Sequence, residues 1–111
     1  RYFEQGMAAG SLRARNNLAW LLATSANAEI RNPARAIEII GPIALYSGSW
    51  QYLDTLAAGH AAAGRYTVAS RIQRQALTAA ADDPTADTEP ERLAMQHRLT
   101  LYESGKRYID P

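Results

Sequence analysis

The sequence predicts an all-α fold, a right-handed helical-repeat solenoid of stacked antiparallel helix pairs with a C-terminal capping helix. Three observations support this prediction. Alanine supplies 22 of the 111 residues, and the β-branched residues never fall in the alternating pattern of a half-buried strand. Glycine and proline divide the chain into segments of helix length. Two consecutive pairs of these segments also resemble each other, which indicates a repeat.

Glycine and a capping serine define the N-terminal segments. Residues 1–10 are expected to be the second helix of a truncated preceding repeat, ending near Gly10. Ser11 is a candidate N-cap for the first helix of a repeat unit that spans residues 11–48.

The second helix of this unit is predicted to begin at Asn32 and Pro33. Asparagine favours the cap position, and proline suits the first helical position because its missing N–H is not needed there. Pro42 lies inside the same helix, where proline removes a donor and clashes with the preceding turn. A kink or a break is therefore expected at Pro42.

The second repeat unit is predicted to span residues 49–83. Ser49 can cap a helix over residues 50–63, and Gly64 can end it in a left-handed conformation. The partner helix is expected over residues 66–81.

Residues 84–111 are predicted to form the capping helix and a tail. Thr88 and Glu91 have capping-box spacing and start a helix that reaches about Ser104. In the second to sixth helices, the positions expected to face the core recur at helical spacing. They include Ala14, Leu18, Leu21, Leu22, Ala36, Ile37, Ile40, Ile43, Ala44, Ala69, Ile72, Ala76, Leu77, Leu93, Met95, Leu99 and Tyr102.

The two units align with a spacing in the mid-thirties. Leu18 and Leu56 are 38 positions apart, whereas Ala36 and Ala69 are 33 positions apart. An insertion between the two helices of the first unit explains both spacings.

The second unit resembles the tetratricopeptide repeat family, whose unit is two antiparallel helices of about 34 residues. The matching positions are Leu53, Leu56, Ala57, His60, Gly64, Tyr66, Ala69, Ala76 and Leu77. Gln73 departs from the pattern because an aromatic residue is usual there. The first unit, with its extended loop, also resembles Sel1-like repeats.

Composition and charge disfavour several classes of function. The formal net charge is +1, and the chain has no cysteine and only two histidines, His60 and His97. His60 falls on a packing position and His97 on a surface, so neither a metal site nor an enzyme active site is expected, and no cofactor is called for. Arg65, Arg71 and Arg74 lack interleaved aromatic residues, so nucleic-acid binding is not expected either. No apolar run reaches the roughly 20 residues that span a bilayer.

The resemblance implies a concave groove, lined by the first helix of each unit, that holds a peptide or a helix of a partner protein. In this sequence the groove residues would be Arg13, Asn16, Asn17, Trp20, Gln51 and Asp54. The asparagines would bond the peptide backbone, and Trp20 would anchor the partner. The predicted function is therefore protein–protein interaction within a larger protein, and the alanine- and arginine-rich composition suits a bacterial one.

Two alternatives stay open at this level. Tyr2, Phe3 and Met7 would lack a covering repeat, so self-association into a scaffold could bury them. The chain could also be a regulatory, non-catalytic segment of a larger enzyme.

Overall fold

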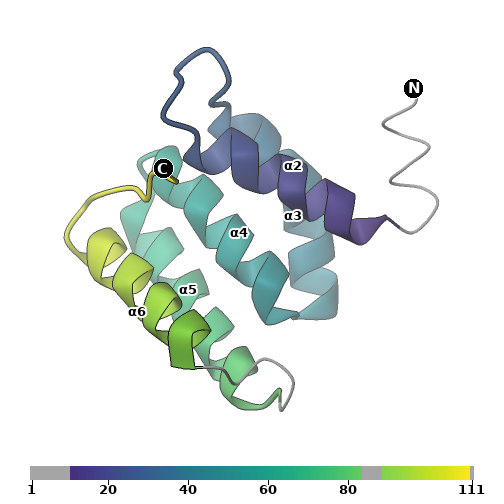
Figure 1. Cartoon of the computed structure of the whole chain (residues 1–111), viewed down its shortest axis with the longest axis vertical. Coiled ribbons are helices and arrows are strands. Elements are labelled where there is room, and N and C mark those ends of the chain that lie inside the picture. The colour runs from purple at the N-terminus through teal and green to yellow at the C-terminus, as the bar shows by residue number, and fades with distance from the viewer. Residues whose placement is uncertain (1–10, 84–88, 111) are drawn as a thin grey trace.

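The computed structural model describes residues 11–83 and 89–110. Over these residues the chain forms five α-helices (Figure 1): α2 (Leu12–Thr24), α3 (Pro33–Ser47), α4 (Trp50–Ala62), α5 (Tyr66–Ala81) and α6 (Glu89–Glu103). The all-α prediction is thus confirmed for these residues. The helix expected over residues 2–9, the surface containing Tyr2, Phe3 and Met7, and the capping residue Thr88 all lie outside the described residues.

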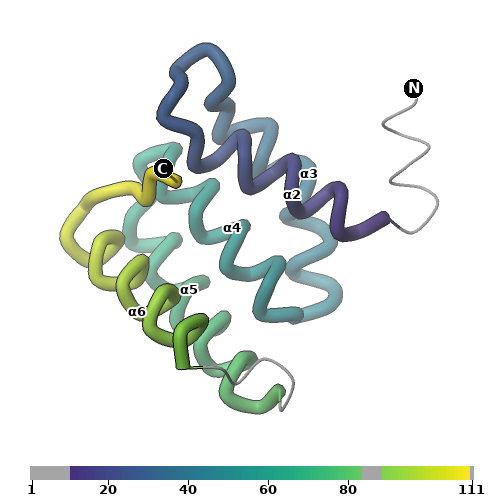
Figure 2. The backbone as a smooth tube through the Cα atoms, in the orientation of Figure 1, coloured from purple at the N-terminus to yellow at the C-terminus, as the bar shows by residue number. Residues whose placement is uncertain are grey.

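The helices pack in a layered order in which α4 is central. α2 packs against α3 and α4, α3 also packs against α4, α4 packs against α5, and α5 packs against α6. The backbone trace in Figure 2 shows that the segment after α6, drawn in yellow, returns across α4 toward the end of α2. The C-terminal segment therefore meets an element far from it in sequence.

Most helix boundaries follow the predicted local signals. Asn32 caps α3, because its Oδ1 accepts a hydrogen bond from the backbone N–H of Arg35 at 3.2 Å. Gly48 ends α3 and Gly64 follows α4 with positive φ angles of 67° and 84°, which only glycine adopts readily. Ser11 precedes its helix as expected, although its side chain makes no capping hydrogen bond.

The break expected at Pro42 does not occur, since α3 continues through this residue to Ser47. Pro42 is exposed, and so is Glu38, whose carbonyl loses its usual helical donor. Both residues lie on the exposed side of α3, away from its buried residues Ala36, Ile40 and Ala44.

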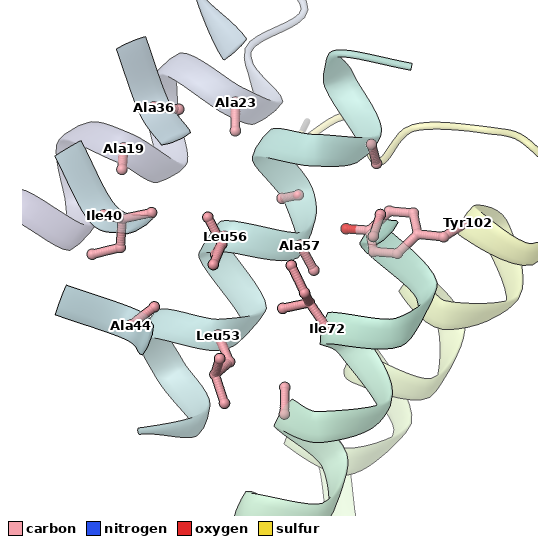
Figure 3. Packing of buried hydrophobic residues seen from close by; sticks show 14 of the residues in the cluster. Ala19, Ala23, Ala36, Ile40, Ala44, Leu53, Leu56, Ala57, Ile72 and Tyr102 are labelled. Carbon is pink, nitrogen blue, oxygen red and sulfur yellow. The ribbon is translucent and has the colours of Figure 1, made fainter. Parts of the chain in front are cut away.

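Small side chains let the helices approach closely (Figure 3). Ala19 and Ala23 of α2 face Ala36 of α3, and Leu56 of α4 fills the space beside them. All three alanines are fully buried. Each buried methylene contributes about 0.8 kcal/mol, so this core is sustained by many small contributions rather than by large aromatic contacts.

Three core predictions are wrong. Leu93 is 62% exposed, Leu21 is 48% exposed, and Ala14, in the first turn of α2, is exposed as well. Met95, Leu99 and Tyr102 form the buried stripe of α6, and Leu93, two positions before Met95, lies about 200° around the helix from it. Leu21 likewise lies two positions from the buried residues Ala19 and Ala23, about 200° around α2 from each of them.

Candidate functional site

A buried ion pair joins α4 to α6. Arg98 donates from Nη2 to Asp54 Oδ2 at 2.8 Å and from Nε to Asp54 Oδ1 at 3.0 Å. The two side chains are only 10% and 11% exposed. Gln73 of α5 adds a third contact, because its Nε2 donates to Asp54 Oδ1 and to the carbonyl of Met95, both at 3.0 Å. The network therefore ties three helices together.

This network corrects the expectation that Asp54 faces a partner protein. Both carboxylate oxygens are engaged within the chain, and the residue is 7% exposed. The position is buried because α2, α3 and α5 all pack against α4, and Arg98 closes the remaining side. Gln73, which departs from the family pattern, is fully buried as a donor to this carboxylate.

Arg98 also lies against two aromatic rings. Its guanidinium carbon is 5.2 Å from the centroid of the Trp20 ring and 5.1 Å from that of Tyr108. The two ring centroids are 5.7 Å apart. A guanidinium near an aromatic face is attracted by the ring's electron density, so Arg98 links the buried network to the surface.

The C-terminal segment, residues 106–110, covers part of the expected groove. The indole Nε1 of Trp20 donates to Asp110 Oδ2 at 2.8 Å. The backbone N–H of Asp110 donates to the carbonyl of Thr24 at 3.0 Å. Trp20 therefore lies on the expected face of α2 but is half-buried, because a segment predicted only as a tail packs on it.

Beside this segment, α2 and α4 enclose a polar hollow of about 200 Å³. A second hollow of about 250 Å³ adjoins it and shares Asn16 and Gln51 with it. Two atoms here are buried without a hydrogen-bond partner among the described residues, the acceptor Asn16 Oδ1 and the donor Trp50 Nε1. The residues that line the first hollow are Asn16, Asn17, Trp20, Trp50, Gln51, Asp54, Thr55 and Arg98.

The structure thus brings five of the six predicted groove residues to one surface. The two hollows are lined by Arg13, Asn16, Asn17, Trp20 and Gln51. Asp54 is buried and forms part of the wall of the first hollow. The sequence interpretation missed Trp50, at the start of α4, and Arg98, which lies in the predicted capping helix. The available signal was Asp54, a single carboxylate within the apolar sequence of α4. A buried carboxylate needs a cation or hydrogen-bond donors beside it.

Two buried groups near this core have perturbed proton affinities. Burial raises the pKa of Tyr102, and the negative charge of Asp54 raises it further. His60 is half-buried, as expected for a packing histidine, and burial followed by the charge of Arg65 lowers its pKa. His97 is exposed on α6.

The described residues contain no group of three or more histidines, cysteines or acidic residues that could hold a metal ion. Within the same residues, none of the helices has the length and apolar character needed to cross a bilayer.

Comparisons with protein-family models, with curated proteins and with solved structures found no match for this chain. The resemblance to tetratricopeptide repeats therefore stays a prediction.

Proposed function

We propose that this chain is a helical-repeat module that binds an extended peptide of a partner protein on the face formed by α2 and α4, and that it has no catalytic role. The helix order supports a repeat. α2 begins at Leu12 and α4 at Trp50, 38 positions later, while α3 begins at Pro33 and α5 at Tyr66, 33 positions later. Two antiparallel pairs, α2–α3 and α4–α5, stacked with α6 as a cap, account for this spacing and for the packing order.

The observation that carries the proposal is the pair of unpartnered atoms in the polar hollow. Asn16 Oδ1 needs a donor, and Trp50 Nε1 needs an acceptor. Both atoms are buried in the unbound chain, so a bound peptide reaches them only when the two side chains turn toward it, and its peptide groups then supply an N–H for Asn16 and a C=O for Trp50. A buried polar group left unpaired costs about 1–3 kcal/mol, and a ligand that pairs it recovers that free energy on binding.

The residues around these two atoms suit a peptide better than a small apolar ligand. Asn17 and Gln51 add exposed amide groups, which can bond further peptide units. Arg13 is exposed at the edge of the adjoining hollow and favours an acidic side chain on the partner. The surface can therefore bond the backbone of a peptide over several residues and favours an acidic side chain at one position.

Selection from a random peptide library displayed on phage tests the proposal. We expect enriched peptides that bind the wild-type protein and bind Asn16→Ala and Trp50→Phe at least ten times more weakly, since a tenfold change corresponds to about 1.4 kcal/mol. Gln96→Ala is the matched control, because this exposed amide lies on α6 outside both hollows.

Two results would reject the proposal. One is a library that yields no enriched peptide for the folded wild-type protein. The other is a set of peptides that bind Asn16→Ala and Trp50→Phe as tightly as the wild type.

A further inference from the structure

The C-terminal segment contacts α2 in the manner of a short bound peptide. Tyr108 places its ring against Trp20 and Arg98, and Asp110 bonds through both its side chain and its backbone. Ile109, between these two contact residues, is 46% exposed, whereas Arg107, before Tyr108, is half-buried. The printed contacts of the segment with α2 are therefore those of Tyr108 and Asp110.

The receiving surface offers one complementary group for each of these contacts. The Trp20 ring and the Arg98 guanidinium accept an aromatic side chain. The Trp20 indole N–H donates a hydrogen bond to a carboxylate, and the Thr24 carbonyl accepts one from a backbone N–H. None of these interactions depends on a covalent connection between the bound segment and α6.

Two further features favour exchange of the segment for another one. The hydrogen bond between Trp20 and Asp110 is exposed, so water competes for both groups. A hollow of about 380 Å³ continues past Asp110 along the end of α2, bordered by Leu21, Ser25 and Asn27. A longer peptide could fill it, whereas the described segment only borders it.

We propose that the surface formed by Trp20, Thr24 and Arg98 is a recognition site for an extended partner segment that carries an aromatic residue two positions before a carboxylate. Residues 106–110 are the internal occupant of this site, and the partner segment displaces them. The groups of this surface set the preference, since Trp20 Nε1 donates to a carboxylate and the Arg98 guanidinium carbon lies 5.1 Å from the centroid of an aromatic ring. This inference rests on the proposed function and adds a second, sequence-selective part to the peptide-binding face.

The experiment frees the site within the whole chain. The variant Tyr108→Ala/Asp110→Ala removes both contact side chains of the segment. The probe is a fluorescein-labelled peptide with the sequence Lys-Arg-Tyr-Ile-Asp and an amidated C-terminus, and binding is followed by fluorescence anisotropy. We expect the variant to bind the probe at least ten times more tightly than the wild-type protein, in which the internal segment competes.

Three controls define the result. A probe with alanine in place of its tyrosine and aspartate should lose binding. The matched variant Lys106→Ala/Ile109→Ala changes two exposed residues of the segment and should behave like the wild type. If the double variant loses its helical circular dichroism, Asp110→Ala alone, which removes only an exposed side-chain hydrogen bond, takes its place and should also bind the probe more tightly than the wild type.

A folded variant that binds the probe no better than the wild type would overturn the inference, and so would equal binding of both probes. The segment would then be a fixed part of the fold. Asn16→Ala should weaken binding of this probe much less than it weakens binding of the selected peptides, because Asn16 shares a hollow with Trp20 and Arg98 but is not among the groups that bond residues 106–110. Failure here is therefore distinct from failure of the library selection, which depends on Asn16 and Trp50.

Discussion

Replacing Arg98 with methionine should strongly destabilise the fold. The substitution leaves the Asp54 carboxylate buried with the Gln73 amide but without its cation. Removing one partner of a buried ion pair costs about 3–5 kcal/mol, because the remaining charge stays desolvated. The contacts of Arg98 with Trp20 and Tyr108 are lost as well. Since domains of this size are stable by about 5–15 kcal/mol, Arg98→Met should remove about a fifth or more of the free energy of unfolding.

Urea denaturation followed by circular dichroism measures this loss, and Arg35→Met is the matched control. Arg35 pairs with Glu38 at 2.7 Å, a distance close to that between Arg98 and Asp54, but its side chain is 51% exposed and that of Glu38 is 69% exposed. Exposed pairs contribute about 0–1 kcal/mol, so the control should unfold at nearly the wild-type urea concentration. The difference between the two variants isolates the effect of burial.

The double variant Asp54→Leu/Arg98→Met tests the reasoning itself. It removes both charges, so no desolvated carboxylate is left, and most of the stability lost in Arg98→Met should return. Equal losses in Arg98→Met and Arg35→Met would refute the argument. A double variant that loses the sum of its two single substitutions would also refute it, because the two side chains would then act independently.

Three further predictions concern backbone conformation and buried polar groups. Gly41→Ala should raise the free energy of unfolding by about 0.5–1 kcal/mol, because alanine favours the helix and its Cβ would lie at an ordinary contact distance of 3.8 Å from Leu56. Gly64→Ala should lower the free energy of unfolding by about 1–2 kcal/mol, because φ at this residue is 84°. Tyr102→Phe should stabilise by about 1 kcal/mol at neutral pH, because the buried hydroxyl has no hydrogen-bond partner among the described residues. The lowered pKa of His60 favours the neutral imidazole in the folded state, so stability should fall as the pH drops below about 6.5, and less so in His60→Gln.

Each of these predictions is checked by urea denaturation. Changes of the same sign at Gly41 and Gly64 would contradict the first. A destabilised Tyr102→Phe would show that the hydroxyl has a favourable partner. Because the pKa of Tyr102 is raised, its folded state holds the proton more tightly, and this contribution to stability should be lost above pH 10 in the wild type but not in Tyr102→Phe. If the free energy of unfolding changes equally with pH between 5.5 and 7.5 in the wild type and in His60→Gln, the prediction for His60 is contradicted.

The helix boundaries were predictable because local chemistry determines them. Asn32 and Pro33 begin α3, and Gly64 follows α4, through interactions that span only a few residues. Of the kink or break expected at Pro42, the break does not occur, since α3 continues to Ser47 with Pro42 on its exposed side. Exposure of that kind is a property of the packed structure and not of the local sequence.

The buried network and the covered surface were not predictable in the same way. Asp54 and Arg98 are 44 positions apart, and no spacing rule relates them. Three of residues 106–110 are charged and the segment follows a glycine, so its sequence is typical of a tail. Its packing depends on the side chains that α2 and α6 present to it. Asn16 and Trp20 could be placed together from the sequence, because residues four positions apart share a helix face, and both line the same hollow.

The most direct test of the peptide-binding face is a titration of the ¹⁵N-labelled protein with a library-selected peptide, followed through its two indole N–H signals in heteronuclear NMR spectra. Trp50 reports on the polar hollow, where its Nε1 is unpartnered, and Trp20 reports on the surface covered by Asp110. A bound peptide should shift the Trp50 signal, because the indole N–H gains an acceptor. The Kd fitted to this shift should equal the Kd measured for binding of the same peptide. A peptide that binds this protein while the Trp50 signal stays in place would contradict the proposed function.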